Sequence, residues 1–235
     1  MLPKYSLRFL FLRMHPYLSA LEKQFRKNAN KTKAAGAKAY LLHQFEFYGL
    51  QAPERRKICK LYLQDNPVPT MQEVEKIVKE AWQLAEREWQ YFAIELLAHY
   101  KKQWKPPVII LMEYCITHKS WWDTVDAIAD GWAGEYFKLF PLQTVTVTGR
   151  WNLSENMWLQ RCSLLFQKKY KHNTDTELLS QYIRHLSSSK EFFIRKAIGW
   201  MLREYAKTNP GWVKRFVETN DLSPLSRREA LKHFK

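Results

Sequence analysis

The 235-residue sequence has few of the residues that build disulfides, metal sites or phosphate-binding loops. Its three cysteines, Cys59, Cys115 and Cys162, are far apart in the chain and lie in apolar helical patterns, which indicates buried free thiols in a reducing compartment. The seven histidines form no zinc-type spacing with cysteine, and the seven glycines form no phosphate-binding loop. We therefore expect no metal, no nucleoside triphosphate site and no cofactor.

Long hydrophobic runs are missing at the N-terminus. Residues 1–13 are partly apolar, but arginines interrupt them and they are too short for an export signal or a membrane span. We interpret residues 1–13 as an N-terminal extension that precedes one domain formed by residues 14–235. No segment has the lysine-lined apolar pattern of an interfacial helix, so no membrane partner is expected.

Strand patterns are nearly absent as well. The β-branched run at residues 144–148 is short and stands in a helical context, so we predict a helix or irregular structure there. Ser154, Thr174 and Ser223 stand where helix N-caps are needed, and Thr70 with Glu73 forms a capping-box pattern. Nearly all other segments have helical periodicity, and the expected helices include residues 33–45, 106–116, 122–140, 142–151, 155–169, 174–186, 190–207, 210–219 and 223–234.

Positive charge and aromatic side chains are abundant. The chain has 38 Lys and Arg against 23 Asp and Glu, a formal net charge of +15, and 10 tryptophans. This excess of positive charge favours a polyanionic partner. The simplest such partners are nucleic acid and an anionic membrane surface, and aromatic side chains together with basic ones fit nucleic acid better than a generic soluble scaffold.

The stretch from Ser120 to Asp126 combines two tryptophans with two carboxylates. On a helix, Trp122 and Asp126 share a face because they are four residues apart, whereas Asp123 lies about 60° away from Asp126. A tryptophan on a helix is most often a core residue, and an aspartate on a basic protein is most often a solvated counter-charge. The alternative is that the indole and the carboxylate of this face together serve a cationic substrate.

A repeat is indicated by the spacing of three residues. Trp122, Arg161 and Trp200 follow one another at intervals of 39 residues, and Tyr40 lies 82 residues before Trp122. A period near 40 is typical of two-helix HEAT-like repeats. Coincidence is the competing explanation in a chain so rich in tryptophan and arginine.

These residues resemble the HEAT-like-repeat alkylpurine DNA glycosylases of the AlkD type, within the DNA alkylation repair family. The resemblance rests on Tyr40, the 120–126 stretch, the run from Trp158 to Arg161 and Trp200, and it covers residues 14–235. It implies an all-α fold, namely a right-handed solenoid of HEAT-like two-helix repeats whose concave basic groove binds duplex DNA as a monomer. We expect a cytoplasmic protein, associated with the nucleoid if the source is bacterial.

The resemblance further implies a role for each matching residue. Asp126 is the expected catalytic carboxylate, and Trp122 and Trp200 are the expected aromatic walls beside the deoxyribose of the lesion. Tyr40 completes that cleft, and Arg161 holds a backbone phosphate. The implied activity is hydrolysis of the N-glycosidic bond of positively charged N3- or N7-alkylated purines in duplex DNA, without base flipping.

Several basic residues lie on the same helical faces as this expected site. Each is a solvated surface charge on the simplest interpretation, and the alternative is contact with DNA phosphates. These candidates are Lys119, Lys168, Lys169, Lys196 and Arg203. A non-catalytic nucleic-acid-binding protein and a helical protein scaffold remain as other functions, but the carboxylate of Asp126 in a basic protein favours the enzyme.

Overall fold

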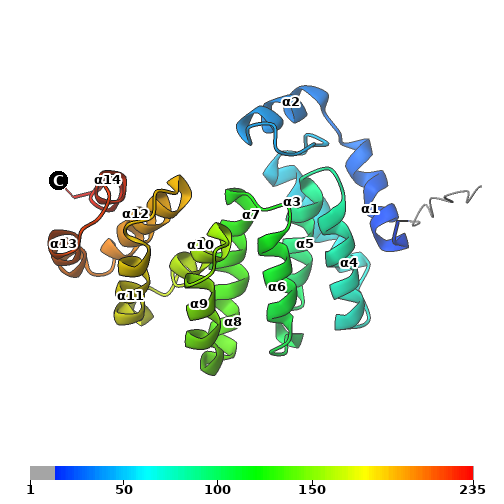
Figure 1. Ribbon diagram of the computed structural model, residues 1–235. Helices are drawn as coiled ribbons and strands as arrows, with labels where there is room; N and C mark the ends of the chain where they lie inside the picture. The colour runs from blue at the N-terminus through cyan, green and yellow to red at the C-terminus, as the bar shows by residue number, and fades with distance from the viewer. Residues whose placement is uncertain (1–13, 235) are drawn as a thin grey trace, which may run out of the picture. The chain divides into compact units, whose positions relative to one another are not determined.

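The structure, a computed structural model, describes residues 14–234, and the chain divides between Ala93 and Ile94 into two compact units. Residues 1–13, expected to be an extension, lie outside the described residues. The first unit contains α1 to α4 and the start of α5 (Figure 1). The bounds of these helices are α1 Pro16–Lys27, α2 Lys31–Tyr40, α3 Ala52–Asp65, α4 Met71–Gln83 and α5 Glu88–His99. The single domain expected over residues 14–235 stays a prediction.

A buried acid organises the first unit. The carboxylate of Glu88, at the start of α5, accepts hydrogen bonds from the backbone N–H groups of Tyr48, Gly49 and Leu50 at 3.1, 2.9 and 3.1 Å. Gly49 adopts a φ of +88°, and a Cβ there would lie 2.1 Å from the backbone oxygen of Asn30. Only glycine fits this position. The hydrogen bonds that three successive backbone N–H groups donate to Glu88 hold the loop before α3 against α5.

One predicted helix ends earlier than its sequence pattern indicates. Residues 33–45 were expected to be helical, but α2 ends at Tyr40. Leu42 and His43 have φ values of +54° and +59°, in the left-handed region, so the helix cannot continue through them. The prediction for residues 41–45 was therefore wrong, because tertiary structure overrides the helical periodicity there.

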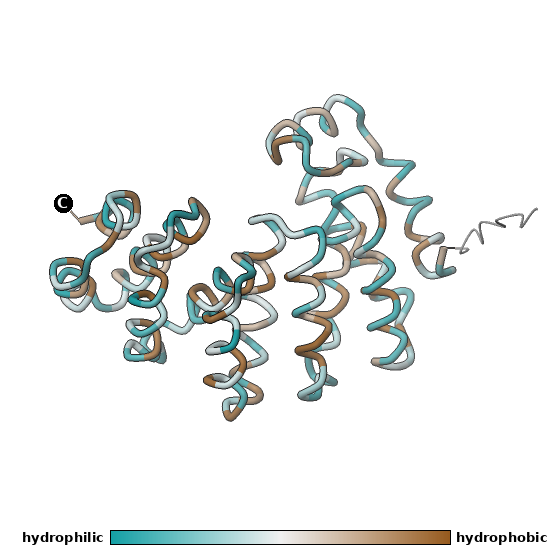
Figure 2. The backbone as a smooth tube through the Cα atoms, viewed as in Figure 1, coloured by the Kyte–Doolittle hydropathy of each residue, from teal (hydrophilic) through white to brown (hydrophobic). Residues whose placement is uncertain are grey.

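The second unit, residues 94–234, consists of further helices joined by short loops. Its α-helices are α6 Val108–Thr117, α7 Trp122–Ala127, α8 Gly134–Leu139, α9 Thr144–Asn152, α10 Met157–Leu165, α11 Thr176–Leu186, α12 Phe192–Ala206, α13 Pro210–Thr219 and α14 Pro224–Ala230. Short 3₁₀ turns are η1 Lys101–Gln103, η3 Pro141–Gln143 and η4 Lys171–Asn173, and a π-helical segment, η2 Ile128–Ala133, joins α7 to α8. The α6 tube is largely hydrophobic (Figure 2), which suits its buried position.

The β-branched run is helical in the structure. It forms the start of α9, where the Thr148 hydroxyl donates to the Thr144 carbonyl and Val147 is buried. The Thr70 side chain accepts a bond from the Glu73 backbone N–H at 3.2 Å, as the capping-box pattern predicts.

Two of the three other predicted N-caps were wrong. Ser223 caps α14, accepting from the backbone of Ser226 at 3.1 Å. Helix α10, however, is capped by Asn156 and not by Ser154, and α11 is capped by Asp175 and not by Thr174. In both helices an amide or carboxylate close to the first turn takes the capping position, because its oxygen reaches two backbone N–H groups at once.

Helix α10 is central to the second unit. It packs against α7, η2, α9 and α12, and α12 in turn packs closely on α14. The helices that carry Trp122, Arg161 and Trp200 are thus direct neighbours through α10, as a repeat of about 40 residues requires. Residues 14–234 form helices and no strand, which confirms the all-α prediction. The right-handed solenoid and its basic groove stay predictions.

Candidate functional site

The site residues of the second unit begin on a helix that changes its pitch. Trp122 is the first residue of α7 and Asp126 lies one turn later. Val125, Ile128 and Ala129 are buried and anchor this helix to the core, so the face with Trp122 and Asp126 is turned partly outward. The helix passes directly into η2, and π-helical turns occur frequently at functional sites.

Asp126 is paired with Arg161 of α10. The guanidinium donates hydrogen bonds to both carboxylate oxygens, from Nε to Oδ1 at 2.6 Å and from Nη2 to Oδ2 at 2.8 Å. The Arg161 side chain is 5% exposed and that of Asp126 is 12% exposed. This bidentate geometry is the strongest form of a carboxylate–guanidinium pair, and it fixes the direction in which the carboxylate points.

A third contact fixes the guanidinium itself. Nη1 of Arg161 donates to the backbone carbonyl of Phe193, beside the start of α12. The Phe193 ring packs against the indoles of Trp121 and Trp158, with ring centroids 5.3 and 5.0 Å apart. Trp121, Trp158 and Phe193 thus form an aromatic cluster, and the ion pair is attached to it through the hydrogen bond from Arg161 to Phe193.

The electrostatics of Asp126 combine opposing effects. Burial raises the pKa of its carboxyl above the ordinary value of 3.8, while the hydrogen bonds and charge of Arg161, and the charge of Lys168, lower it. The neighbouring carboxylate of Asp130 adds to the rise in pKa. The Asp126 carboxyl, with its raised pKa, is therefore more easily protonated than that of a surface aspartate, even with the Arg161 guanidinium bound to it.

A second acid lies one turn after Asp126. Asp130, in η2, pairs with Lys168 through Oδ2 and with Lys169 through Oδ1, the latter at 2.9 Å. The Lys168 ammonium also lies 3.8 Å from the centroid of the Trp200 ring. Asp130, Lys168 and Trp200 thus form a continuous chain of contacts from η2 to α12, which we call the Asp130 network.

Two further candidates for phosphate contact are also engaged in ion pairs. Lys196 and Arg203 of α12 both pair with Glu229 of α14, at 2.9 and 2.7 Å. Their positive charges neutralise and orient a carboxylate between the two helices and lower the pKa of Glu229, chiefly through the Lys196 hydrogen bond. Their role as phosphate contacts stays a prediction.

The remaining predicted residues are Lys119, Asp123 and Tyr40. Lys119 directly precedes the 120–126 stretch and has a left-handed φ of +49°. Asp123 is partly exposed on the first turn of α7. Tyr40 ends α2 in the first unit, with 69% of its surface exposed. The structure therefore brings Asp126 together with Arg161, and Lys168 together with Trp200.

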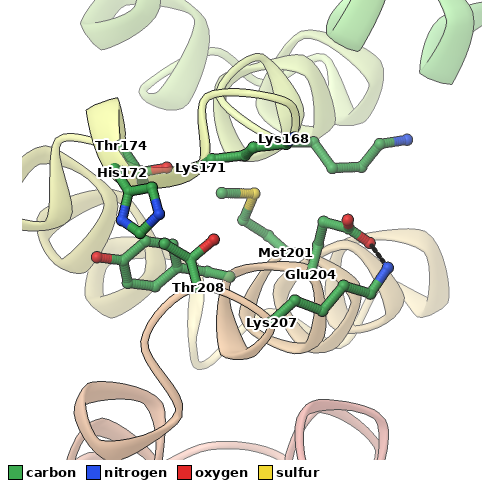
Figure 3. A pocket seen from close by; sticks show the side chains of 9 residues that line it. Lys168, Lys171, His172, Thr174, Met201, Glu204, Lys207 and Thr208 are labelled. Atoms are coloured by element: carbon green, nitrogen blue, oxygen red, sulfur yellow. Dashed lines mark hydrogen bonds and ion pairs between the residues drawn. The ribbon is translucent and has the colours of Figure 1, made fainter.

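A cavity of about 300 Å³ lies beside the Asp130 network, between the loop after α10 and the last turns of α12 (Figure 3). Basic and polar side chains dominate its wall, and the ion pair between Glu204 and Lys207 closes one side of it, at 2.7 Å. The lining residues are Lys168, Lys171, His172, Thr174, Met201, Glu204, Tyr205, Lys207 and Thr208.

Sequence reasoning did not identify Asp130 or Phe193. A signal existed for Asp130, because it lies four residues after Asp126 just as Lys168 lies seven after Arg161, so each pair shares a helix face. No sequence signal marks Phe193, since the atom that contacts Arg161 is a backbone carbonyl oxygen, which every residue possesses.

Comparison with known proteins identifies the family. The sequence model of the DNA alkylation repair enzyme family matches residues 21–234. A solved structure from Enterococcus faecalis, described as a predicted DNA alkylation repair enzyme, is 34% identical, covers 88% of this chain and 96% of its own, and superposes with a TM-score of 0.83. This protein belongs to the DNA alkylation repair enzyme family. No curated protein matches the chain significantly.

Two other solved structures share the fold of this family member at lower identity. AlkD2 from Streptococcus mutans is 17% identical, with a TM-score of 0.66, and the match covers 94% of this chain and 99% of AlkD2. The alkylpurine DNA glycosylase AlkC from Pseudomonas fluorescens, solved with DNA that contains an abasic site analog, is 15% identical with a TM-score of 0.57. That match covers 92% of this chain and 61% of AlkC.

The family assignment confirms the resemblance drawn from Tyr40, residues 120–126, Arg161 and Trp200. Within residues 14–234 of this DNA alkylation repair family member, no cluster of three or more His, Cys, Asp or Glu side chains is arranged to hold a metal ion. None of the described helices is both long and apolar enough to cross a membrane.

Proposed function

We propose that this protein is a DNA glycosylase that hydrolyses the N-glycosidic bond of positively charged N3- or N7-alkylated purines in duplex DNA. The observation that carries the proposal is the Asp126 carboxylate, fixed at both oxygens by Arg161 one helical turn from Trp122. Family membership and the net charge of +15 support a DNA substrate.

The chemistry of the substrate explains the need for such a carboxylate. Alkylation at N3 or N7 makes the purine cationic, so it leaves without a general acid. Positive charge then develops on the deoxyribose, and a carboxylate held in place stabilises that charge without reorganising. Each Asp126 oxygen accepts one bond from Arg161, so lone pairs remain on both oxygens for the sugar or for a water molecule.

Aromatic side chains complement the same charge. In the proposed mechanism Trp122 and Trp200 contact the deoxyribose of the lesion, and the role implied for Tyr40 stays a prediction. Indole faces attract cations and polarised C–H groups. Reaction without base flipping follows from such a site, because the contacts are made to the sugar and the base need not enter a pocket.

The proposed partner is double-stranded DNA, bound by a monomer. AlkC, which shares the fold, was solved with DNA that contains an abasic site analog. In the free protein the Arg161 Nε, Nη1 and Nη2 atoms each donate to a protein acceptor. A phosphate contact by Arg161 would use the remaining N–H groups of its terminal nitrogens.

A non-catalytic nucleic-acid-binding protein is the second candidate. The observation in its favour is the pairing of Asp126 with Arg161, since this pair is as consistent with a structural ion pair as with a site. Two points argue against a purely structural pair. Apolar residues can often replace such a buried pair without loss of stability, so stability alone does not require it. The Asp126 side chain also keeps 12% of its surface exposed, one helical turn from Trp122.

Release of free base from methylated duplex DNA under single-turnover conditions tests the proposal. We expect Asp126→Asn to lower the rate constant about 100-fold, the effect of losing one electrostatic stabiliser, while DNA binding persists. Asp123→Asn is the matched control, because it removes a carboxylate from the same helix without touching Arg161. If the natural protein binds DNA and releases no base, the second candidate replaces the first.

A further inference from the structure

We infer that Lys168, held in place by Asp130, is a positioning residue that fixes the indole of Trp200 relative to the Asp126 carboxylate. The inference rests on the proposed function, in which Trp200 contacts the lesion sugar. It assigns the Asp130 network to the reaction, whereas the sequence pattern places Lys168 among the phosphate contacts.

The position of the ammonium group is specific. Lys168 Nζ lies 3.8 Å from the centroid of the Trp200 ring, within the distance at which an ammonium is attracted to an indole face. The Lys168 side chain is only 12% exposed, while that of its neighbour Lys169 is 62% exposed. A lysine that served only as a solvated or phosphate-binding charge would not be enclosed in this way.

Asp130 accounts for the enclosure of this lysine. Its carboxylate pairs with both lysines, through Oδ2 to Lys168 and Oδ1 to Lys169, and is itself 11% exposed. A buried charge is costly unless it is paired, so Asp130 supplies the counter-charge for the ammonium that lies over Trp200. The network consequently depends on one acid and on one of two adjacent lysines.

The two ion pairs link the same pair of helical segments. Asp126 to Arg161 and Asp130 to Lys168 both run from the α7–η2 helix to the α10 helix and its C-terminal turn. The carboxylate and the lysine that orients the indole therefore belong to one frame. Misplacement of a reacting contact by about 1 Å can cost about 100-fold in rate, so a shared frame favours catalysis.

An indole has two faces, and Lys168 takes one of them. The proposed sugar contact then uses the opposite face or the edge of Trp200. Loss of Lys168 would leave the indole free to rotate about its side-chain torsions, because the attraction that favours a single orientation is gone. The change would affect the rate of the chemical step more than the binding of DNA.

Four variants test this inference: Lys168→Met, Lys168→Arg, Asp130→Asn and the control Lys169→Met. Lys169→Met removes one positive charge, as Lys168→Met does, from the adjacent residue that also pairs with Asp130. The Lys169 side chain differs in being mostly exposed. Single-turnover base release and DNA affinity are measured for each. The ¹⁹F NMR resonance of Trp200 is followed in protein labelled with 5-fluorotryptophan and is assigned with Trp200→Phe.

We expect Lys168→Met to lower the single-turnover rate about 10- to 100-fold with little change in DNA affinity and to shift the Trp200 resonance. Asp130→Asn should also lower the rate and shift the Trp200 resonance, but less than Lys168→Met does. Lys168→Arg should keep the rate and the resonance close to those of the natural protein, since arginine also pairs with carboxylates and stacks on aromatic rings. Lys169→Met should leave the Trp200 resonance in place, because the Lys168 ammonium still lies over the indole.

Two results would overturn the inference. One is an active natural protein whose Lys168→Met variant keeps its rate and its Trp200 resonance. The other is an equal loss of DNA affinity in Lys168→Met and Lys169→Met with an unchanged rate on bound DNA, which would make both lysines phosphate contacts. Absence of base release by the natural protein would instead refute the proposed function, and the resonance would still report whether Lys168 orients Trp200.

Discussion

The buried pair of Asp126 and Arg161 makes a quantitative prediction about stability. Two unit charges about 4 Å apart attract by about 4 kcal/mol at the effective dielectric constant of about 20 that suits proteins. Both oxygens of the carboxylate are engaged, at 2.6 and 2.8 Å, and both side chains are largely buried. We therefore expect the two residues to be strongly coupled in the free energy of unfolding.

The perturbation is a double-mutant cycle of Asp126→Asn and Arg161→Met. Removing Arg161 leaves a buried carboxylate without its partner, so the free energy of unfolding should fall by about 3–5 kcal/mol. Asp126→Asn should cost about 1–3 kcal/mol, because the amide oxygen still accepts one bond from Arg161. The double variant should recover about 2 kcal/mol relative to the sum of the single losses.

Urea denaturation followed by circular dichroism measures the cycle. The control is the same cycle on Glu204 and Lys207, an exposed pair at 2.7 Å, where we expect a coupling below about 0.5 kcal/mol. If the single losses at Asp126 and Arg161 add to within about 0.5 kcal/mol, the two groups do not interact as argued here, and the fixed carboxylate of the proposed mechanism is refuted.

Gly199→Ala should destabilise by about 1–3 kcal/mol, because its Cβ would meet Glu229 and Ser226 at 2.5 and 2.7 Å, whereas Gly149→Ala, with 3.6 Å of room, should stabilise α9 by up to about 1 kcal/mol; thermal unfolding measures both. Glu88→Gln should cost about 1–3 kcal/mol in urea denaturation, because an amide nitrogen would face backbone N–H donors, and an unchanged midpoint would contradict the three bonds described. Base release should decline with falling pH through a pKa above 3.8, because burial raises the pKa of Asp126 and only its ionised form stabilises the sugar; a rate that stays flat across that range would refute this role.

Much of the fold follows from local sequence. Helical periodicity and terminal signals place most helices within a few residues, and the Ser223 and Thr70 caps are those expected. The failures also have local causes. The side chains of Asn156 and Asp175, and not those of the neighbouring Ser154 and Thr174, accept from the first backbone N–H groups of α10 and α11. The end of α2 at Tyr40 depends on the left-handed residues that follow, which no periodicity marks.

The sequence by itself determined the all-α class, the basic and aromatic character of the chain, and the family, since spacing along a helix and residue types are local properties. Only the tertiary structure decided that Asp126 meets Arg161, 35 residues away, and that Lys168 lies over Trp200 while Lys169 remains exposed. The physical reason is that an ion pair depends on which helices pack together. Lys168 and Lys169 are adjacent in the turn after α10 and pair with the same carboxylate, and only the packing of α12 against this turn encloses the first and leaves the second exposed.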